Sequence, residues 1–235
     1  MTRSTSPVAL VHGWGGSFAT TWERSGFTAL LEDAGVPVIG IDLLGHGTAP
    51  KPHDPDAYAD LTARIVAQLP DEPVDAVGFS LGAITLLRLA IDQPHRFGHL
   101  VLAGIGSNVF AQDSSGTAAI VAGLDHVASG GDPSELDNQV RLFTQYASQP
   151  GNDLAALTAV MRRPPGSPIT AEACATVTCP VLVVVGDKDF VYPADELAAA
   201  FPDGRCEVLR GVDHFATTEA FGFFDAALEF LDAVC

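Results

Sequence analysis

The chain has 235 residues, of which 47% are hydrophobic, and carries a formal net charge of −17. This length suffices for one large domain with a filled core, with or without an inserted lid. The acidic balance argues against nucleic acid as a partner, because phosphate binding needs clustered lysine and arginine. No apolar run approaches the ~20 residues of a membrane span, and no long apolar signal segment opens the chain, so we expect a cytoplasmic protein with no membrane partner.

Short apolar runs alternate with amphipathic stretches along most of the chain. The runs predict six strands, within residues 7–13, 36–45, 73–80, 99–106, 179–189 and 205–215. The stretches between and after them predict helices, at residues 20–35 (closed by Gly35), 54–70, 81–94, 194–201 and 219–234. This alternation is typical of an α/β fold, with a mostly parallel six-stranded sheet and helices on both faces. We expect residues 1–235 to form one domain.

Residues 107–175 interrupt this alternation. They hold three helical patterns and no convincing strand, and the second pattern follows "PSELD", where Ser134 is placed to cap the helix. About 65 residues of short helices would bury too little surface to form a domain alone. We therefore predict a helical lid inserted between two strands of the sheet.

The stretch "AVGFSLGAITLLRLA" contains the clearest candidate for chemistry. Ser80 lies where a predicted strand meets a predicted helix, between Gly78 and Gly82. In a strand–Gly-x-Ser-x-Gly–helix turn the serine sits on a sharp, strained bend, and any side chain at the two glycine positions would clash across it. Ser80 is the predicted nucleophile, and the N–H of Leu81 is directed toward the same space.

A serine hydroxyl needs a base and a group that orients the base. Of seven histidines, His214 follows the last strand at the carboxyl edge of the sheet, where loops gather around a site. We interpret the histidines near loops and caps as surface residues: His46, His53, His95, His99 and His126. His214 is the predicted base.

The orienting acid is expected after the preceding strand, in "VVVGDKDF". Asp189 is preferred because it lies past the glycine turn, and Asp187 is the second choice. Asp213 is a poor partner for His214, because the side chains of adjacent residues diverge. The chain order Ser80, Asp189, His214 is the order expected for this type of triad.

The loop "HGWGGS", which begins at His12, follows the first strand and is expected to supply a second oxyanion donor beside Leu81. The N–H of Trp14 is the natural candidate, and its indole is left to pack in the pocket. A nucleotide-binding loop is a weaker interpretation, because the Gly-x-Gly-x-x-Gly pattern is absent.

The remaining polar and apolar candidates are less specific. Four cysteines, at 174, 179, 206 and 235, are too few and too unevenly spaced for a disulfide framework or a zinc site, and we predict no metal and no cofactor. Phe143 and Met161 of the insertion are predicted to contact substrate. Arg162 and Arg163 either meet a substrate carboxylate or form a solvated helix end.

The motifs "VHGWGGS", "GIDLLGHG", "GFSLGA", "VGDKDFVYP" and "GVDHF" together resemble the α/β-hydrolase fold family. The resemblance covers nearly the whole chain, is weakest in the insertion, and is nearest to lid-bearing esterases such as the pimeloyl-carrier methyl ester carboxylesterases. It implies the same triad and the same two oxyanion donors. Two departures from the family are expected: the sheet should lack the usual N-terminal hairpin, and Ala83 stands where many relatives have a second glycine.

These residues predict a serine hydrolase that cleaves esters of small to medium apolar substrates through an acyl-enzyme. The expected partner is a small-molecule ester, and the protein is expected to be a monomer or a homodimer. The same triad also supports cleavage of thioesters, lactones, amides and carbon–carbon bonds, and cofactor-free perhydrolysis. A non-catalytic small-molecule receptor, or a scaffold whose glycine loops are only structural, would have no physical need for a complete triad.

Overall fold

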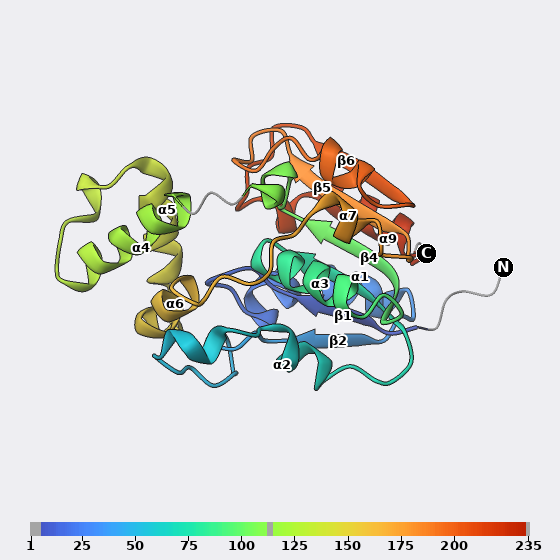
Figure 1. The fold of residues 1–235 in the computed structure, drawn as a ribbon, viewed down its shortest axis with the longest axis horizontal. Helices are drawn as coiled ribbons and strands as arrows, with labels where there is room; N and C mark the ends of the chain where they lie inside the picture. Colours follow the sequence, from blue (N-terminus) through green and yellow to red (C-terminus); the bar gives the residue numbers. More distant parts are fainter. Residues whose placement is uncertain (1–5, 112–114, 234–235) are drawn as a thin grey trace.

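The computed structural model describes residues 6–111 and 115–233 (Figure 1). Residues 112–114 of the expected insertion, residue 234 of the last expected helix and Cys235 lie outside this part. The six strands run parallel in the order β2-β1-β3-β4-β5-β6, which confirms the predicted fold class. Their bounds are β1 Val8–Val11, β2 Val38–Ile41, β3 Val74–Phe79, β4 Phe97–Ala103, β5 Val181–Gly186 and β6 Gly204–Leu209.

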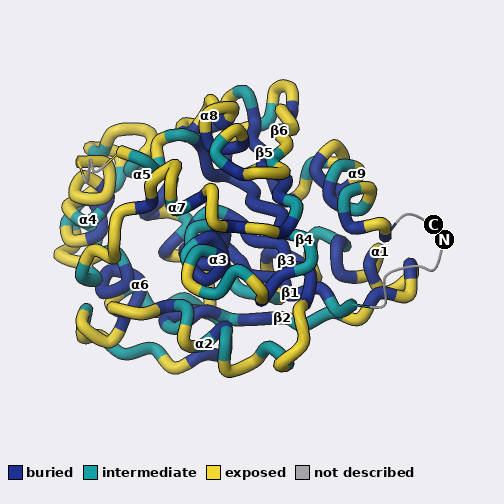
Figure 2. The backbone as a smooth tube through the Cα atoms, turned by 45° about the vertical axis from the view of Figure 1, so that its right-hand side comes forward, coloured by how far each residue is buried: buried dark blue, intermediate teal, exposed yellow. Residues whose placement is uncertain are grey.

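The central strands are covered on both faces (Figure 2). In β1, Ala9 and Val11 belong to one apolar cluster, and Val8 and Leu10 belong to another. Because successive side chains of a strand point to opposite sides, this split places a core on each face of the sheet. Continuous apolar runs such as that of β5 are the sequence pattern of such strands.

Different helices cover the two faces of the sheet. The helices α1 Phe27–Asp33 and α9 Phe221–Phe230 cover one face, around the buried rings of Trp22, Phe27 and Phe223. The helices α2 Thr62–Val66, α3 Leu81–Asp92 and α8 Asp195–Ala199 cover the other. No helix in residues 6–111 and 115–233 is long and apolar enough to span a membrane.

The segment between β4 and β5 contains short helices and projects from the carboxyl edge of the sheet (Figure 1). We call residues 107–175 the helical insertion. In it α4 packs against both α5 and α6. Its main helices are α4 Ser115–Ala128, α5 Asn138–Ala147 and α6 Leu154–Met161, and the short α7 Ala171–Cys174 follows them.

Three local predictions were wrong. Residues 20–35 form a π-helical turn, Ala19–Glu23, and then α1, because Gly26 between them has a φ of 86° that no helix accommodates. Residues 54–70 form a 3₁₀ turn, Pro55–Tyr58, and the short α2. Ser134 lies in a 3₁₀ turn, Pro133–Glu135, whose own cap is Asp132, and α5 begins further on, after Asp137.

Candidate active site

The turn between β3 and α3 holds Ser80 in a strained conformation. Its φ is 50° and its ψ is −112°, a backbone conformation that residues other than glycine rarely adopt. A Cβ on Gly78 would lie 2.7 Å from the nitrogen of Ala83. A Cβ on Gly82 would lie 2.4 Å from the carbonyl oxygen of Val11, so the start of α3 packs directly on β1. The turn therefore requires glycine at both positions. It places Ser80 directly after β3, at the carboxyl edge of the sheet.

The structure brings Ser80, His214 and Asp189 into one hydrogen-bonded chain. His214 Nε2 lies 3.0 Å from Ser80 Oγ, and His214 Nδ1 lies 2.8 Å from Asp189 Oδ2. The ring of His214 and the carboxylate of Asp189 are both buried. With the Nδ1 proton donated to the carboxylate, Nε2 is left as the acceptor for the serine hydroxyl.

The other acidic candidates have different partners. Asp187 accepts a hydrogen bond from the N–H of Gly211 at 2.7 Å. Asp213 accepts from the N–H of Ala216 at 3.0 Å. Asp189 also accepts from the N–H of Val191 at 3.0 Å, so the turn after β5 fixes its carboxylate toward His214.

The loop after β1 and the start of α3 both border the serine. A Cβ on Gly13 would lie 3.3 Å from the Cβ of Ser80, so the loop after β1 runs directly past the turn that carries the serine. Leu81 is the first residue of α3, where the N–H has no acceptor within the helix. Among residues 6–111 and 115–233, neither Leu81 N–H nor Trp14 N–H donates to the protein.

Aromatic rings surround the candidate base. The rings of Phe190, Phe79 and Phe215 have their centroids 4.5, 5.0 and 5.7 Å from that of His214. Phe143, from α5, contacts Phe190 at 5.8 Å and Trp14 at 5.8 Å. Phe143 is thus one ring removed from His214, and Trp14 is two rings removed.

The sequence interpretation missed Phe190 and Phe215. Each directly follows a residue of the triad, Asp189 or His214, in the chain. Their adjacency to Asp189 and His214 could have indicated that both phenylalanines lie near the site. The direction of each ring, however, depends on the turn that follows. Phe190 is 48% exposed, which is unusual for a phenylalanine.

Met161 and the two arginines do not join this group. Met161 ends α6 and is half-buried against the core. Arg162 is exposed and pairs with Asp125 at 2.5 Å. Arg163 donates to the carbonyl of Val160 at 2.7 Å, and burial, with Arg88 nearby, lowers its pKa.

Two buried histidines lie beneath the loop after β1, and the prediction that His46 is a surface residue was wrong. His12 Nδ1 donates to the carbonyl of Gly13 at 2.7 Å, and its Nε2 accepts from the N–H of Leu43 at 3.1 Å. His46 lies against His12, with ring centroids 5.0 Å apart. Burial, and then the neighbouring His12, lowers the pKa of His46 to about 3. The His12 ring is therefore neutral, with one nitrogen donating and the other accepting, and it joins Gly13 to Leu43.

A parallel sheet with a serine on a strained strand–helix turn, an acid after β5 and a histidine after β6 defines the α/β-hydrolase architecture. The model of the alpha/beta hydrolase family matches residues 8–232. The chain belongs to this family, as the motifs predicted.

Named relatives match over part of their length. A pimeloyl-[acyl-carrier protein] methyl ester esterase of Neisseria meningitidis is 36% identical over 117 residues, which is 48% of this chain and 34% of that protein. An esterase of Mycobacterium tuberculosis is 30% identical over 115 residues, 47% of this chain and 37% of that protein. The matches to the first curated relatives span only 34–42% of their length. A solved bromoperoxidase of Bacillus anthracis has a TM-score of 0.72 at 23% identity, covering 98% of this chain and 93% of that one, and shares the fold.

Proposed function

We propose that the chain is a serine hydrolase that cleaves carboxylic esters through an acyl-enzyme. The observation that carries the proposal is the chain of hydrogen bonds from Ser80 through His214 to Asp189, mounted on a strained turn. The esterase names of two relatives support ester hydrolysis.

In the proposed reaction His214 Nε2 takes the proton of Ser80 as Oγ attacks the ester carbonyl. The Asp189 carboxylate stabilises the imidazolium and keeps Nδ1 protonated. The N–H groups of Trp14 and Leu81 hold the developing oxyanion. His214 returns the proton to the leaving alcohol, and a water then attacks the acyl-enzyme with His214 again as base. No step requires a cofactor.

We propose that the helical insertion acts as a lid over this site within a single domain. Phe143 of α5 reaches the rings of Phe190 and Trp14 beside the triad. An aromatic lining of this kind favours small or medium apolar acyl groups over charged ones. Phe143 and Trp14 are the proposed substrate contacts.

The test is hydrolysis of p-nitrophenyl esters from acetate to decanoate by the wild type and by Ser80→Ala. We expect measurable wild-type rates with a preference for one chain length, and loss of the rate in Ser80→Ala. Ser134→Ala is the matched control, since Ser134 is an exposed serine of the insertion. Stoichiometric labelling of Ser80 by a fluorophosphonate separates a hydrolase from a receptor, and a folded protein that neither turns over esters nor is labelled contradicts the proposal.

A further inference from the structure

The loop that carries Trp14 (residues 12–17) is fastened to the helical insertion by two hydrogen bonds. The indole N–H of Trp14 donates to the carbonyl of Leu157 in α6 at 3.0 Å. The side-chain amide of Asn152 donates to the carbonyl of Gly15 at 2.8 Å. These bonds span 143 and 137 residues of chain, so the oxyanion loop takes part of its shape from the insertion.

At Gly15 the loop is supported mainly by residues of the helical insertion. Gly15 has a φ of 76°, and the loop's internal backbone bond is a long one, from Gly16 N–H to Gly13 carbonyl at 3.2 Å. A hollow of about 240 Å³ lies beside Gly15, Ser17 and Asn152. The ring of Tyr146 packs on the other side of Gly15, where a Cβ would lie 2.7 Å from Tyr146 Cδ1. The side-chain amide of Asn152 is the donor that meets the Gly15 carbonyl.

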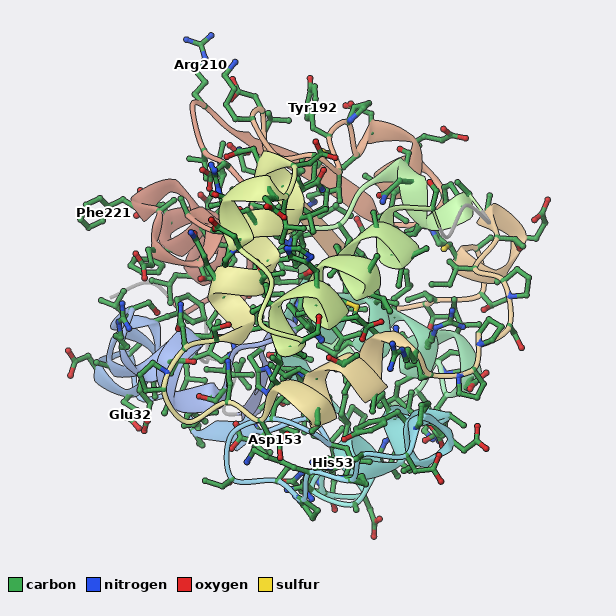
Figure 3. All side chains as sticks on the ribbon, turned by 90° about the vertical axis from the view of Figure 1, so that its left-hand side faces the viewer. Glu32, His53, Asp153, Tyr192, Arg210 and Phe221 are labelled. Carbon is green, nitrogen blue, oxygen red and sulfur yellow. The ribbon has the colours of Figure 1, made fainter. Side chains whose placement is uncertain are left out.

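Asn152 is itself held on both sides. Its amide nitrogen also lies 3.3 Å from the carbonyl of Tyr146, in the last turn of α5, where helix carbonyls lack partners within the helix. The next residue, Asp153, caps α6 by accepting from Ala156 N–H at 3.0 Å. Asp153 also pairs with His53 at 3.0 Å, and Figure 3 shows these two side chains together at the edge of the insertion. The amide is therefore presented to the loop from a fixed position.

We propose that Asn152 is a positioning residue for the oxyanion hole, acting through Gly15 on the N–H of Trp14. This inference rests on the proposed function. The Gly15 carbonyl shares its peptide plane with the N–H of Gly16, which donates to the Gly13 carbonyl at 3.2 Å, and that carbonyl shares its plane with the N–H of Trp14. A Gly15 carbonyl released from Asn152 can rotate at the glycine and weaken this link, which leaves His12 Nδ1 as the remaining donor to the Gly13 carbonyl. Loss of the Asn152 bond thus misplaces one of the two oxyanion donors without touching Ser80, His214 or the acyl pocket. The hole is complete only when the insertion is seated on the loop.

The test compares Asn152→Ala and Asn152→Asp with the wild type on the preferred p-nitrophenyl ester. Aspartate keeps the volume of asparagine but presents oxygens to the Gly15 carbonyl, so it separates hydrogen bonding from packing. Because loss of an entire oxyanion donor costs about 10²–10³ in kcat, we expect both variants to lose about 10–100-fold in kcat with KM nearly unchanged. Gln149→Ala, in the same connection between α5 and α6 as Asn152, is the matched control and should keep the wild-type kcat.

An alkyl boronic acid gives a second readout, because its adduct with Ser80 places an oxygen in the hole. Its affinity should fall in parallel with kcat/KM across the variants, which a merely structural role would not produce. Wild-type kcat in Asn152→Asp, or unchanged boronate affinity in a folded Asn152→Ala, overturns the inference. If Ser80→Ala retains activity, the proposed function itself fails, whatever the Asn152 variants do.

Discussion

The strand–helix turn around Ser80 and the helical insertion represent two ways of building one site. Around the turn, the glycines cannot accept a Cβ, since Gly78 and Gly82 meet backbone atoms of Ala83 and Val11. In the insertion, Gly116 and Gly151 have nothing within 4 Å of such a Cβ. The first region is fixed by contacts between backbones, whereas the second is largely exposed (Figure 2). Where the insertion is tightly packed it is packed by side chains, as at Gly123, where a Cβ would lie 2.2 Å from Val140 Cγ1.

This difference separates two tasks. A nucleophile and its base need positions fixed within a fraction of an ångström, which backbone contacts in a buried sheet supply. A surface that admits substrates needs adaptable side chains, which short exposed helices supply. The Asn152–Gly15 bond is where the two regions meet, and the predictions below test how far each region can be changed alone.

The largest expected effect comes from the triad. Asp189→Asn keeps the shape of the buried side chain but lets the wrong tautomer of His214 form, so we expect kcat to fall about 10³–10⁴-fold. Asp187→Asn is the matched control in the same turn and should keep the wild-type kcat, because Asp187 contacts Gly211 and not His214. Kinetics of both variants on one p-nitrophenyl ester make the comparison. Equal losses in the two variants would contradict the assigned roles.

Gly82→Ala tests the close packing of α3 on β1. The new Cβ would lie 2.4 Å from the carbonyl oxygen of Val11 and 2.5 Å from that of His12, so the helix must move. We expect the free energy of unfolding to fall by at least about 2 kcal/mol, with activity lost as Ser80 shifts. Urea unfolding measures the first and ester hydrolysis the second. A variant with wild-type stability and rate would show that the turn is not rigid.

The sheet could largely be predicted from the sequence, and so could the proximity of Ser80, His214 and Asp189. Buried parallel strands produce continuous apolar runs, as in β5, and the carboxyl ends of such strands gather at one edge, which brought Asp189 and His214 together in the prediction. Ser80 could be identified because Gly78 and Gly82 flank it, and a Cβ at either position would clash with backbone atoms.

What could not be read depends on contacts between distant segments. The burial of His46 is set by the ring of His12, and a loop histidine has no local mark of burial. The bond from Asn152 to Gly15 joins residues 137 positions apart, and asparagine in a loop is usually a turn residue. The break at Gly26 depends on a φ of 86°, which a glycine permits but does not demand.

A smaller effect is expected from the buried histidine in the rigid region. The pKa of His46 is about 3 in the folded protein, below its ordinary value of 6.5. The unfolded chain therefore binds this proton between pH 6.5 and 3 and the folded protein does not, so stability falls as the pH falls through that window. One such group contributes about 1.4 kcal/mol per pH unit at most. His46→Gln should flatten the fall in unfolding free energy between pH 7 and 5, whereas His95→Gln, at an exposed histidine, is the matched control and should leave it unchanged.

The smallest effect is expected in the insertion. Gly116 lies in the first turn of α4, exposed and with open space where a Cβ would stand. Alanine there removes freedom from the unfolded chain without a clash, so Gly116→Ala should raise the free energy of unfolding by about 0.5–1 kcal/mol and leave kcat unchanged. Urea unfolding beside Gly82→Ala compares the same substitution in the two regions. Opposite signs support the division between a rigid turn and a permissive insertion, and a destabilised Gly116→Ala would mean that α4 is packed as tightly as the sheet.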